Sequence, residues 1–240
     1  MPSKWDFKPA ADQGLSETQR AKSSKREAGL GTLALSALSM TVTRTALAVW
    51  HRYTVVGREH LPTQTPFVMV ANHASHLDHA ALRSALPLPL RVRTHPLAAG
   101  DVFFSSTLRA AVATRTINAL PMWRKKVGPH ALADLRDRLQ VGDVGFVLFP
   151  EGARTRDGSL MKFKAGVGML VAGLDVPVIP AWLDGCFRAM PPHTVLPRPC
   201  RITARFGPPL RFKETPNSRE GWEHVIAQVE SAVRALQPPA

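Results

Sequence analysis

A histidine and an aspartate, His73 and Asp78, lie five residues apart just after a short apolar run. Within one helix this spacing would turn the two side chains roughly 140° away from each other. They can meet if His73 lies in the turn before the helix, with Ser75 as N-cap and Asp78 completing a capping box. A carboxylate on one imidazole nitrogen fixes the tautomer and leaves the other nitrogen as a base. The pair is a candidate for general-base catalysis, although a capped helix with surface histidines would show the same spacing.

The same segment offers a second chemistry, because His76, Asp78 and His79 form a His-x-Asp-His core. That core supplies metal ligands in metallo-β-lactamase-like hydrolases, where another histidine stands two residues earlier; this chain has Ala74 there. A metal site also needs ligands from farther along the chain. The candidates are scattered and have no motif around them: His95, His130, Asp143 and His193. A metal-dependent hydrolase is therefore the alternative from a different class, and we expect no metal here.

A second polar group follows the apolar run 144–149 and contains Glu151 and Gly152. The proline and glycine around the glutamate end a strand and open a loop. Arg154 follows at once, and an arginine fork binds phosphate or carboxylate through paired hydrogen bonds. Lys164 precedes a predicted helix, whose N-terminus also attracts anions. We expect an anion-binding loop, and a solvated arginine-rich turn is the alternative.

These polar groups must be positioned by the elements around them. Four apolar runs predict strands at 66–70, 144–149, 177–182 and 201–206. Between and after them, helices are predicted at 79–86, 104–114, 130–140, 166–173 and 218–236. This alternation predicts an α/β fold with a mostly parallel, twisted sheet flanked by helices. Functional sites in such sheets gather where strands end and helices begin. The proline-rich stretches 86–89 and 190–199 predict surface loops.

The first 52 residues predict a polar tail followed by an amphipathic helix over 30–52. No apolar core follows a basic start, so we expect no signal peptide. The uncharged stretch 28–43 is about 16 residues long, whereas a membrane span needs about 20. Leu30, Leu33 and Leu38 form a partial helical stripe that would lie in a membrane interface or pack on the protein core. We therefore divide the chain into a membrane-associating segment, 1–52, and a domain, 53–240.

The charge of the chain is unusual, since 31 Lys and Arg stand against 18 Asp and Glu, a net charge of +13. Part of the surplus lies between residues 83 and 126: Arg83, Arg91, Arg93, Arg109, Arg115, Arg124, Lys125 and Lys126 against Asp101. Such a surplus indicates an anionic partner, and a nucleic-acid-binding motif is not found. Only two cysteines, Cys186 and Cys200, are present, which excludes a disulfide framework.

Four segments together resemble the blocks of the glycerolipid acyltransferase family, which includes bacterial 1-acylglycerol-3-phosphate acyltransferases. Residues 72–78 are similar to its first block, His-x4-Asp, and Arg124 matches the arginine that closes the second. Residues 149–154 resemble the third block, Phe-Pro-Glu-Gly-Thr-Arg, and 176–180 the fourth, which ends in proline. The blocks occur in the family's order, and the resemblance covers roughly residues 50–212.

The resemblance implies that His73 removes the proton of an acceptor hydroxyl while Asp78 holds the imidazole. The oxygen then attacks the thioester of acyl-CoA or acyl-carrier protein directly, with no further cofactor. The expected acceptor-binding residues are Arg124, Glu151, Gly152, Arg154 and Lys164.

The expected function is acyl transfer to a lysophospholipid, first of all 1-acylglycerol-3-phosphate, in phospholipid biosynthesis. We expect a peripheral or monotopic protein that binds an anionic membrane surface on the cytoplasmic side. We expect it to bind no nucleic acid. Two departures concern the acceptor. Ala153 replaces the common threonine of the third block, and the residues before Arg124 lack the acid often found there. Another lysolipid acceptor is therefore the alternative within the same chemistry.

Overall fold

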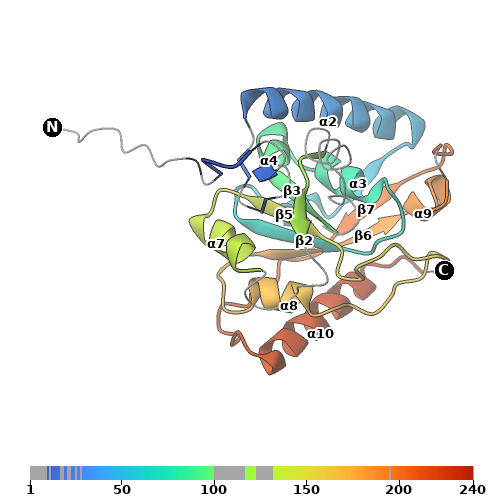
Figure 1. The fold of residues 1–240 in the computed structure, drawn as a ribbon. Coiled ribbons are helices and arrows are strands. Elements are labelled where there is room, and N and C mark those ends of the chain that lie inside the picture. Colours follow the sequence, from blue (N-terminus) through green and yellow to red (C-terminus); the bar gives the residue numbers. More distant parts are fainter. Residues whose placement is uncertain are drawn as a thin grey trace.

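The structure is a computed structural model that describes residues 29–99, 117–122, 132–194 and 196–239, with positions 10, 12–16, 19–20, 23–24 and 26–27. Within these residues a seven-stranded sheet has the order β1-β7-β6-β2-β5-β3-β4 (Figure 1). The strands are β1 (Thr54–Val56), β2 (Phe67–Ala71), β3 (Thr94–Ala99), β4 (Leu120–Met122), β5 (Gly145–Leu148), β6 (Val178–Asp184) and β7 (Thr203–Phe206). Every neighbouring pair is parallel except β6 and β7. The predicted α/β fold with a mostly parallel sheet is confirmed.

Helices cover both faces of the sheet (Figure 1). On one face lie α2 (Leu30–Trp50), α3 (Asp78–Ser84) and α4 (Leu88–Val92), and on the other α7 (Ala133–Val141), α8 (Gly166–Val171) and α10 (Arg219–Ala235). A 3₁₀ turn, η1 (Arg58–His60), and the short helix α9 (Cys186–Ala189) complete the described elements.

The central strand β2 shows why both faces are needed. All five of its residues are buried. Successive side chains of a strand point to opposite faces, so Phe67 and Met69 join the core under α2–α4, while Val68 and Val70 join the core over α7, α8 and α10. A continuous apolar run of this kind is typical of a parallel strand covered on both sides.

Most predicted elements are confirmed within one to three residues, but several were missed. The stretch 86–89, predicted as a loop, contributes to α4, because Pro87 is the N-cap and the second proline lies in the first turn, where helices tolerate it. The short strand β1 and the helix α9 gave no clear pattern. The predicted helix 104–114 and the start of the predicted helix 130–140 lie outside the described residues.

The strand β3 was missed because it begins with polar residues and contains a proline. Both polar side chains are buried and satisfied by backbone carbonyls: Thr94 Oγ1 donates to Leu90 O at 2.6 Å, and His95 Nδ1 lies 3.0 Å from Asn118 O. Burial and the charge of Arg138 lower the pKa of His95 to about 3, which keeps the ring neutral. The partner of Thr94 is local, four residues earlier, whereas the partner of His95 lies 23 residues away, and a local pattern does not contain that contact.

The predicted N-terminal helix is present as α2, which packs on α3 and α4. Met40 and Leu47 are buried, whereas Leu30, Leu38 and Val49 are 86%, 62% and 75% exposed. By length and composition alone this 21-residue helix, with a mean hydropathy of 1.3, could cross a membrane. The sequence interpretation placed it below that limit, because it ended the uncharged stretch before Arg44. The division of the chain at residue 52 stays a prediction.

Candidate active site

Two neighbouring strands place the two predicted polar segments, which contain His73 and Glu151, at the carboxyl ends of the sheet strands. β2 and β5 are parallel and in register, with Val70 opposite Leu148. Their carboxyl ends therefore lie side by side, and the loops that follow them meet. The backbone N–H of Thr155, from the second loop, donates to His73 O in the first at 2.9 Å. The structure thus brings together the His73 and Glu151 segments, which the sequence placed 78 residues apart.

His73 and Asp78 form the predicted pair. His73 Nδ1 lies 2.8 Å from Asp78 Oδ2, and the same oxygen accepts the backbone N–H groups of Ala74 at 2.6 Å and Ser75 at 2.8 Å. Asp78 is completely buried, whereas the His73 side chain is 24% exposed. With Nδ1 held by the carboxylate, Nε2 is the nitrogen that can act as a base.

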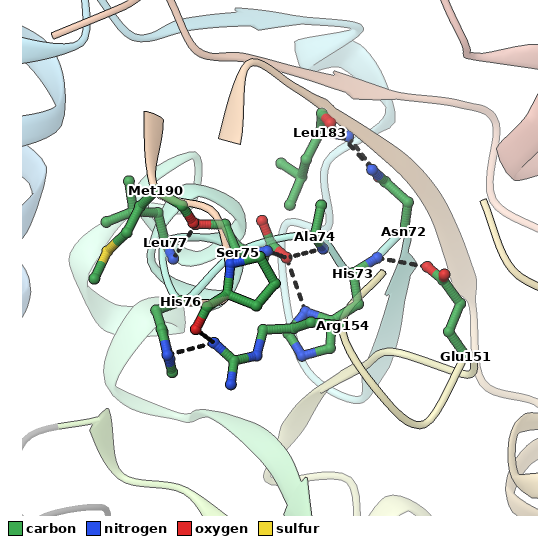
Figure 2. Close-up of polar contacts among 12 residues, drawn as sticks. Asn72, His73, Ala74, Ser75, His76, Leu77, Glu151, Arg154, Leu183 and Met190 are labelled. Carbon is green, nitrogen blue, oxygen red and sulfur yellow. Dashed lines mark hydrogen bonds and ion pairs between the residues drawn. The ribbon is translucent and has the colours of Figure 1, made fainter. Parts of the chain in front are cut away.

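The capping prediction was half correct. The carboxylate of Asp78 does reach back to the N–H of Ser75, as a capping box requires. However, α3 begins only at Asp78 with Leu77 as its N-cap, and the Ser75 hydroxyl bonds elsewhere. Ser75 Oγ accepts from Leu77 N at 3.1 Å and donates to Met190 O at 2.8 Å (Figure 2). The serine therefore ties the loop after α9 to the His73 segment.

Two residues that support His73 were missed by the sequence interpretation. Asn72 is buried and bonds the backbone of Leu183 in β6 twice, through Leu183 N to Asn72 Oδ1 at 2.7 Å and Asn72 Nδ2 to Leu183 O at 3.1 Å (Figure 2). Phe149 stacks on the His73 ring, with the ring centroids 4.1 Å apart. An amide directly after an apolar strand and an aromatic at the end of its neighbour are weak signals. Only the parallel register makes them adjacent.

Glu151 is placed behind His73 rather than among the residues that line the pocket. It is only 2% exposed. Oε1 accepts the backbone N–H of His73 at 2.6 Å, and Oε2 accepts that of Met161 at 2.9 Å (Figure 2 shows the first). Burial raises the pKa of Glu151 to about 7, although both backbone N–H groups oppose this shift. In this position the carboxylate holds the backbone of the His73 loop.

Gly152 and Lys164 lie against each other beside Glu151. Gly152 has a φ of +72°, which favours glycine, and a Cβ atom there would lie 2.8 Å from Lys164 Nζ. Lys164 is exposed, and its backbone N–H donates to Pro150 O at 2.9 Å. The cation is therefore at the edge of the site. Arg124, the remaining predicted acceptor-binding residue, lies outside the described residues.

A pocket of about 300 Å³ opens in front of His73. Its lining includes the polar side chains of His73, His76 and Arg154 and the apolar side chains of Leu97, Ile117 and Met122. An imidazole, a guanidinium and apolar side chains therefore line one cavity. Such a cavity suits a substrate with a hydroxyl, an anionic group and a hydrocarbon portion.

The metal-hydrolase alternative finds little support in this geometry. Asp78 Oδ2 is engaged by three N–H groups, and His76 Nε2 contacts Arg154. A cation beside a metal ligand would oppose metal binding. In the part of the chain that the structure describes, no group of three or more His, Cys, Asp or Glu side chains is placed to hold a metal ion.

Comparison with known proteins agrees with the site geometry. The family model Acyltransferase matches residues 52–184. Human 1-acyl-sn-glycerol-3-phosphate acyltransferase alpha is 30% identical over 131 residues, which are 54% of this chain and 44% of the human protein. The chloroplastic 1-acyl-sn-glycerol-3-phosphate acyltransferase BAT2 of Brassica napus is 30% identical over 146 residues, 59% of this chain and 40% of that protein. The matched region thus spans less than half of these relatives.

A solved structure has the same fold. The crystal structure of the 1-acyl-sn-glycerophosphate acyltransferase PlsC from Thermotoga maritima is similar with a TM-score of 0.64 at 22% identity, over 85% of this chain and 78% of that one. The family match covers more than half of the 240 residues and includes His73, Asp78, Glu151 and Arg154. The chain therefore belongs to the Acyltransferase family.

Proposed function

We propose that this protein transfers a fatty acyl group from acyl-CoA or acyl-carrier protein to the free hydroxyl of a lysophospholipid, with 1-acylglycerol-3-phosphate as the preferred acceptor. The observation that carries the proposal is the His73–Asp78 pair beside a pocket that is lined by His73, a cation and apolar residues. The family membership and the names of the relatives support the same reaction.

The proton path follows from the hydrogen bonds of His73. Asp78 accepts from Nδ1, so Nε2 removes the proton of the acceptor hydroxyl as its oxygen attacks the thioester carbonyl. The resulting imidazolium is stabilised by the buried carboxylate. When the tetrahedral intermediate collapses, the carbon–sulfur bond breaks, and the thiolate leaves with the proton from His73. No covalent acyl-enzyme is required, and the base returns to its starting state.

Arginine supplies the acceptor specificity in this proposal. Arg154 lines the same pocket as His73, and a guanidinium binds a phosphate through paired hydrogen bonds. We include Arg124, Gly152 and Lys164 as further acceptor-binding positions, and the net charge of +13 favours the approach of both anionic substrates. Because Ala153 lacks the common hydroxyl, a different lysophospholipid is the second candidate acceptor. Nucleic acid has no role in this proposal.

The membrane contact is proposed at the outer face of α2. A groove of about 820 Å³ runs along this face and is lined by Val42, Val49 and Trp50 with Leu196 from a loop. Val42 is 61% exposed and Leu196 80% exposed. An exposed apolar face on a helix that is buried on its other side suits the interface of a bilayer. We therefore propose a peripheral or monotopic protein.

The cytoplasmic side is proposed for the reaction, because its donors are acyl-CoA or acyl-carrier protein. Two free cysteines, buried Cys186 and half-buried Cys200, are consistent with a reducing compartment. In this proposal residues 1–52 are a polar tail and a membrane-associating helical segment, and 53–240 form the acyltransferase domain.

An assay of purified protein with a panel of lysolipids tests the acceptor, with acyl-CoA and acyl-carrier protein as alternative donors. We expect thiol release together with diacyl product, and the highest kcat/KM for lysophosphatidate. Higher kcat/KM for another lysophospholipid would replace the acceptor and keep the reaction. Absence of acyl transfer to every lysolipid would contradict the proposed function.

A further inference from the structure

His76 takes no part in the His73–Asp78 pair, yet its side chain contacts Arg154, the cation that lines the pocket. His76 Nε2 is hydrogen-bonded to Arg154 Nη1, and Figure 2 shows the two side chains pointing toward each other. They come from different loops, which are joined by the bond from Thr155 N to His73 O at 2.9 Å. The backbone hydrogen bond that joins the two loops therefore also brings His76 and Arg154 together.

The bond requires a neutral His76, because only an unprotonated Nε2 can accept from a guanidinium. Partial loss of water, the charge of Arg154 and the nearby His73 all lower the pKa of His76, whereas Asp78 opposes the shift. The ring is therefore neutral at neutral pH. Nε2 then presents a lone pair to Nη1, and Nδ1 carries the proton.

Arg154 is held from a second side by the loop after α9. Nη1 also lies 3.4 Å from Pro192 O, and this loop is tied to the His73 segment through the bond from Ser75 Oγ to Met190 O. Both contacts use Nη1. For Nε and Nη2, the described part of the chain shows no hydrogen-bond partner. This edge of the guanidinium has the geometry that binds two phosphate oxygens.

We propose that His76 is a positioning residue that holds Arg154 through Nη1 and so presents the Nε and Nη2 edge to the phosphate of the acceptor. The inference rests on the proposed function, since it takes the phosphate of a lysophospholipid as the anion at Arg154. It also gives a role to a histidine whose place in a metal site the geometry does not support. His76 controls acceptor binding and leaves the base, His73, in place.

The test compares His76→Leu with His76→Gln in the full-length protein. Leu removes the side-chain acceptor of Nη1 and leaves only the longer contact with Pro192 O. We expect the KM for lysophosphatidate to rise about five- to twenty-fold, as for a lost charged hydrogen bond. We expect kcat and the KM for acyl-CoA to stay within about threefold of the wild type. Gln retains an oxygen acceptor and should restore much of the acceptor KM. His193→Leu, an exposed residue beside Pro192, is the matched control.

A double-mutant cycle shows whether the effect passes through Arg154. In the Arg154→Ala background, His76→Leu should change the KM for lysophosphatidate no further. Additive losses, or an unchanged KM in His76→Leu alone, would overturn the inference while the wild-type activity upholds the proposed function. If the wild-type protein acylates only acceptors without a phosphate, the proposed acceptor and the inference both fail.

Discussion

Glu151 Oε1 accepts the backbone N–H of His73 at 2.6 Å. A carboxylate in the loop after β5 therefore holds the backbone of the loop after β2. Its other oxygen accepts Met161 N at 2.9 Å, which places the carboxylate between two loops. Glu151 therefore fixes the backbone of His73, and Asp78 fixes its imidazole ring. Within the proposed mechanism, these contacts favour a positioning role for Glu151 over direct contact with the acceptor.

Glu151 should make folding stability depend on pH. Burial raises its pKa to about 7, from 4.5 for an ordinary glutamate. Because the folded protein holds this proton more tightly than the unfolded chain, the stabilisation is complete below pH 4.5 and is lost as the pH rises through 7. Glu151→Gln is neutral throughout, so its Tm should decline less than that of the wild type over this window. Thermal unfolding at several pH values measures the difference.

The control for this pH dependence is Glu223→Gln, the same change at a glutamate whose side chain is 67% exposed on α10. It should keep the wild-type slope of Tm against pH. Equal slopes for Glu151→Gln and the wild type would show that Glu151 does not carry a raised pKa in the folded protein.

Replacement of His73 should separate catalysis from folding. His73→Ala removes the base, and we expect kcat to fall by about 10²- to 10⁴-fold. The free energy of unfolding should change little, because Asp78 still accepts the N–H groups of Ala74 and Ser75. Acyl-transfer assays and denaturant unfolding of one preparation measure both. A kcat close to that of the wild type would remove His73 from the proposed mechanism.

Replacement of Asp78 should affect both properties. Asp78→Ala leaves three donors without their acceptor, two of them backbone N–H groups in a buried loop. We expect the free energy of unfolding to fall by about 2–4 kcal/mol, the scale for buried donors left unsatisfied. Activity should fall with it, since the imidazole loses its orientation. Denaturant unfolding that matches the wild type would contradict the structural part of this role.

The sequence predicts β2 and β5 well because both are continuous apolar runs that end in proline, glycine or polar residues. It also predicts the contact between His73 and Asp78, because a capping box and a hydrogen-bonded His–Asp pair both require the carboxylate to fold back toward the preceding turn. The strand β3 escapes prediction, because buried His95 finds its partner in Asn118 O, 23 residues farther along the chain. A pattern of residue types contains no information on such partners.

The role of Glu151 shows a second limit of sequence interpretation. Its place in the third block predicts a position in the site, yet not the direction in which its carboxylate points. That direction follows from the parallel register of β2 with β5, which sets the His73 N–H opposite Oε1. His76 is a similar case: the His-x-Asp-His core offered a metal ligand only as an alternative, and the assembled loops place its Nε2 on Arg154.

Gly152→Ala should disturb the cation at the edge of the site. A φ of +72° costs a residue with a side chain about 1–2 kcal/mol. The new Cβ would also lie 2.8 Å from Lys164 Nζ, so the flexible lysine must move away. We expect lower stability and a higher KM for lysophosphatidate. If Lys164→Ala alone reproduces the KM change with wild-type stability, the lysine and not the backbone strain accounts for it.

Acidic substitutions on the outer face of α2 should weaken membrane binding without unfolding the protein. Val42 and Val49 are 61% and 75% exposed, so Val42→Asp with Val49→Asp leaves the buried side of the helix intact. Loss of two apolar contacts should lower partitioning into anionic vesicles by about tenfold or more. Val141→Asp, on α7 and 77% exposed, is the same change across the sheet and should bind normally. Vesicle sedimentation measures all three proteins, and unchanged binding of the double variant would exclude this face as the membrane contact.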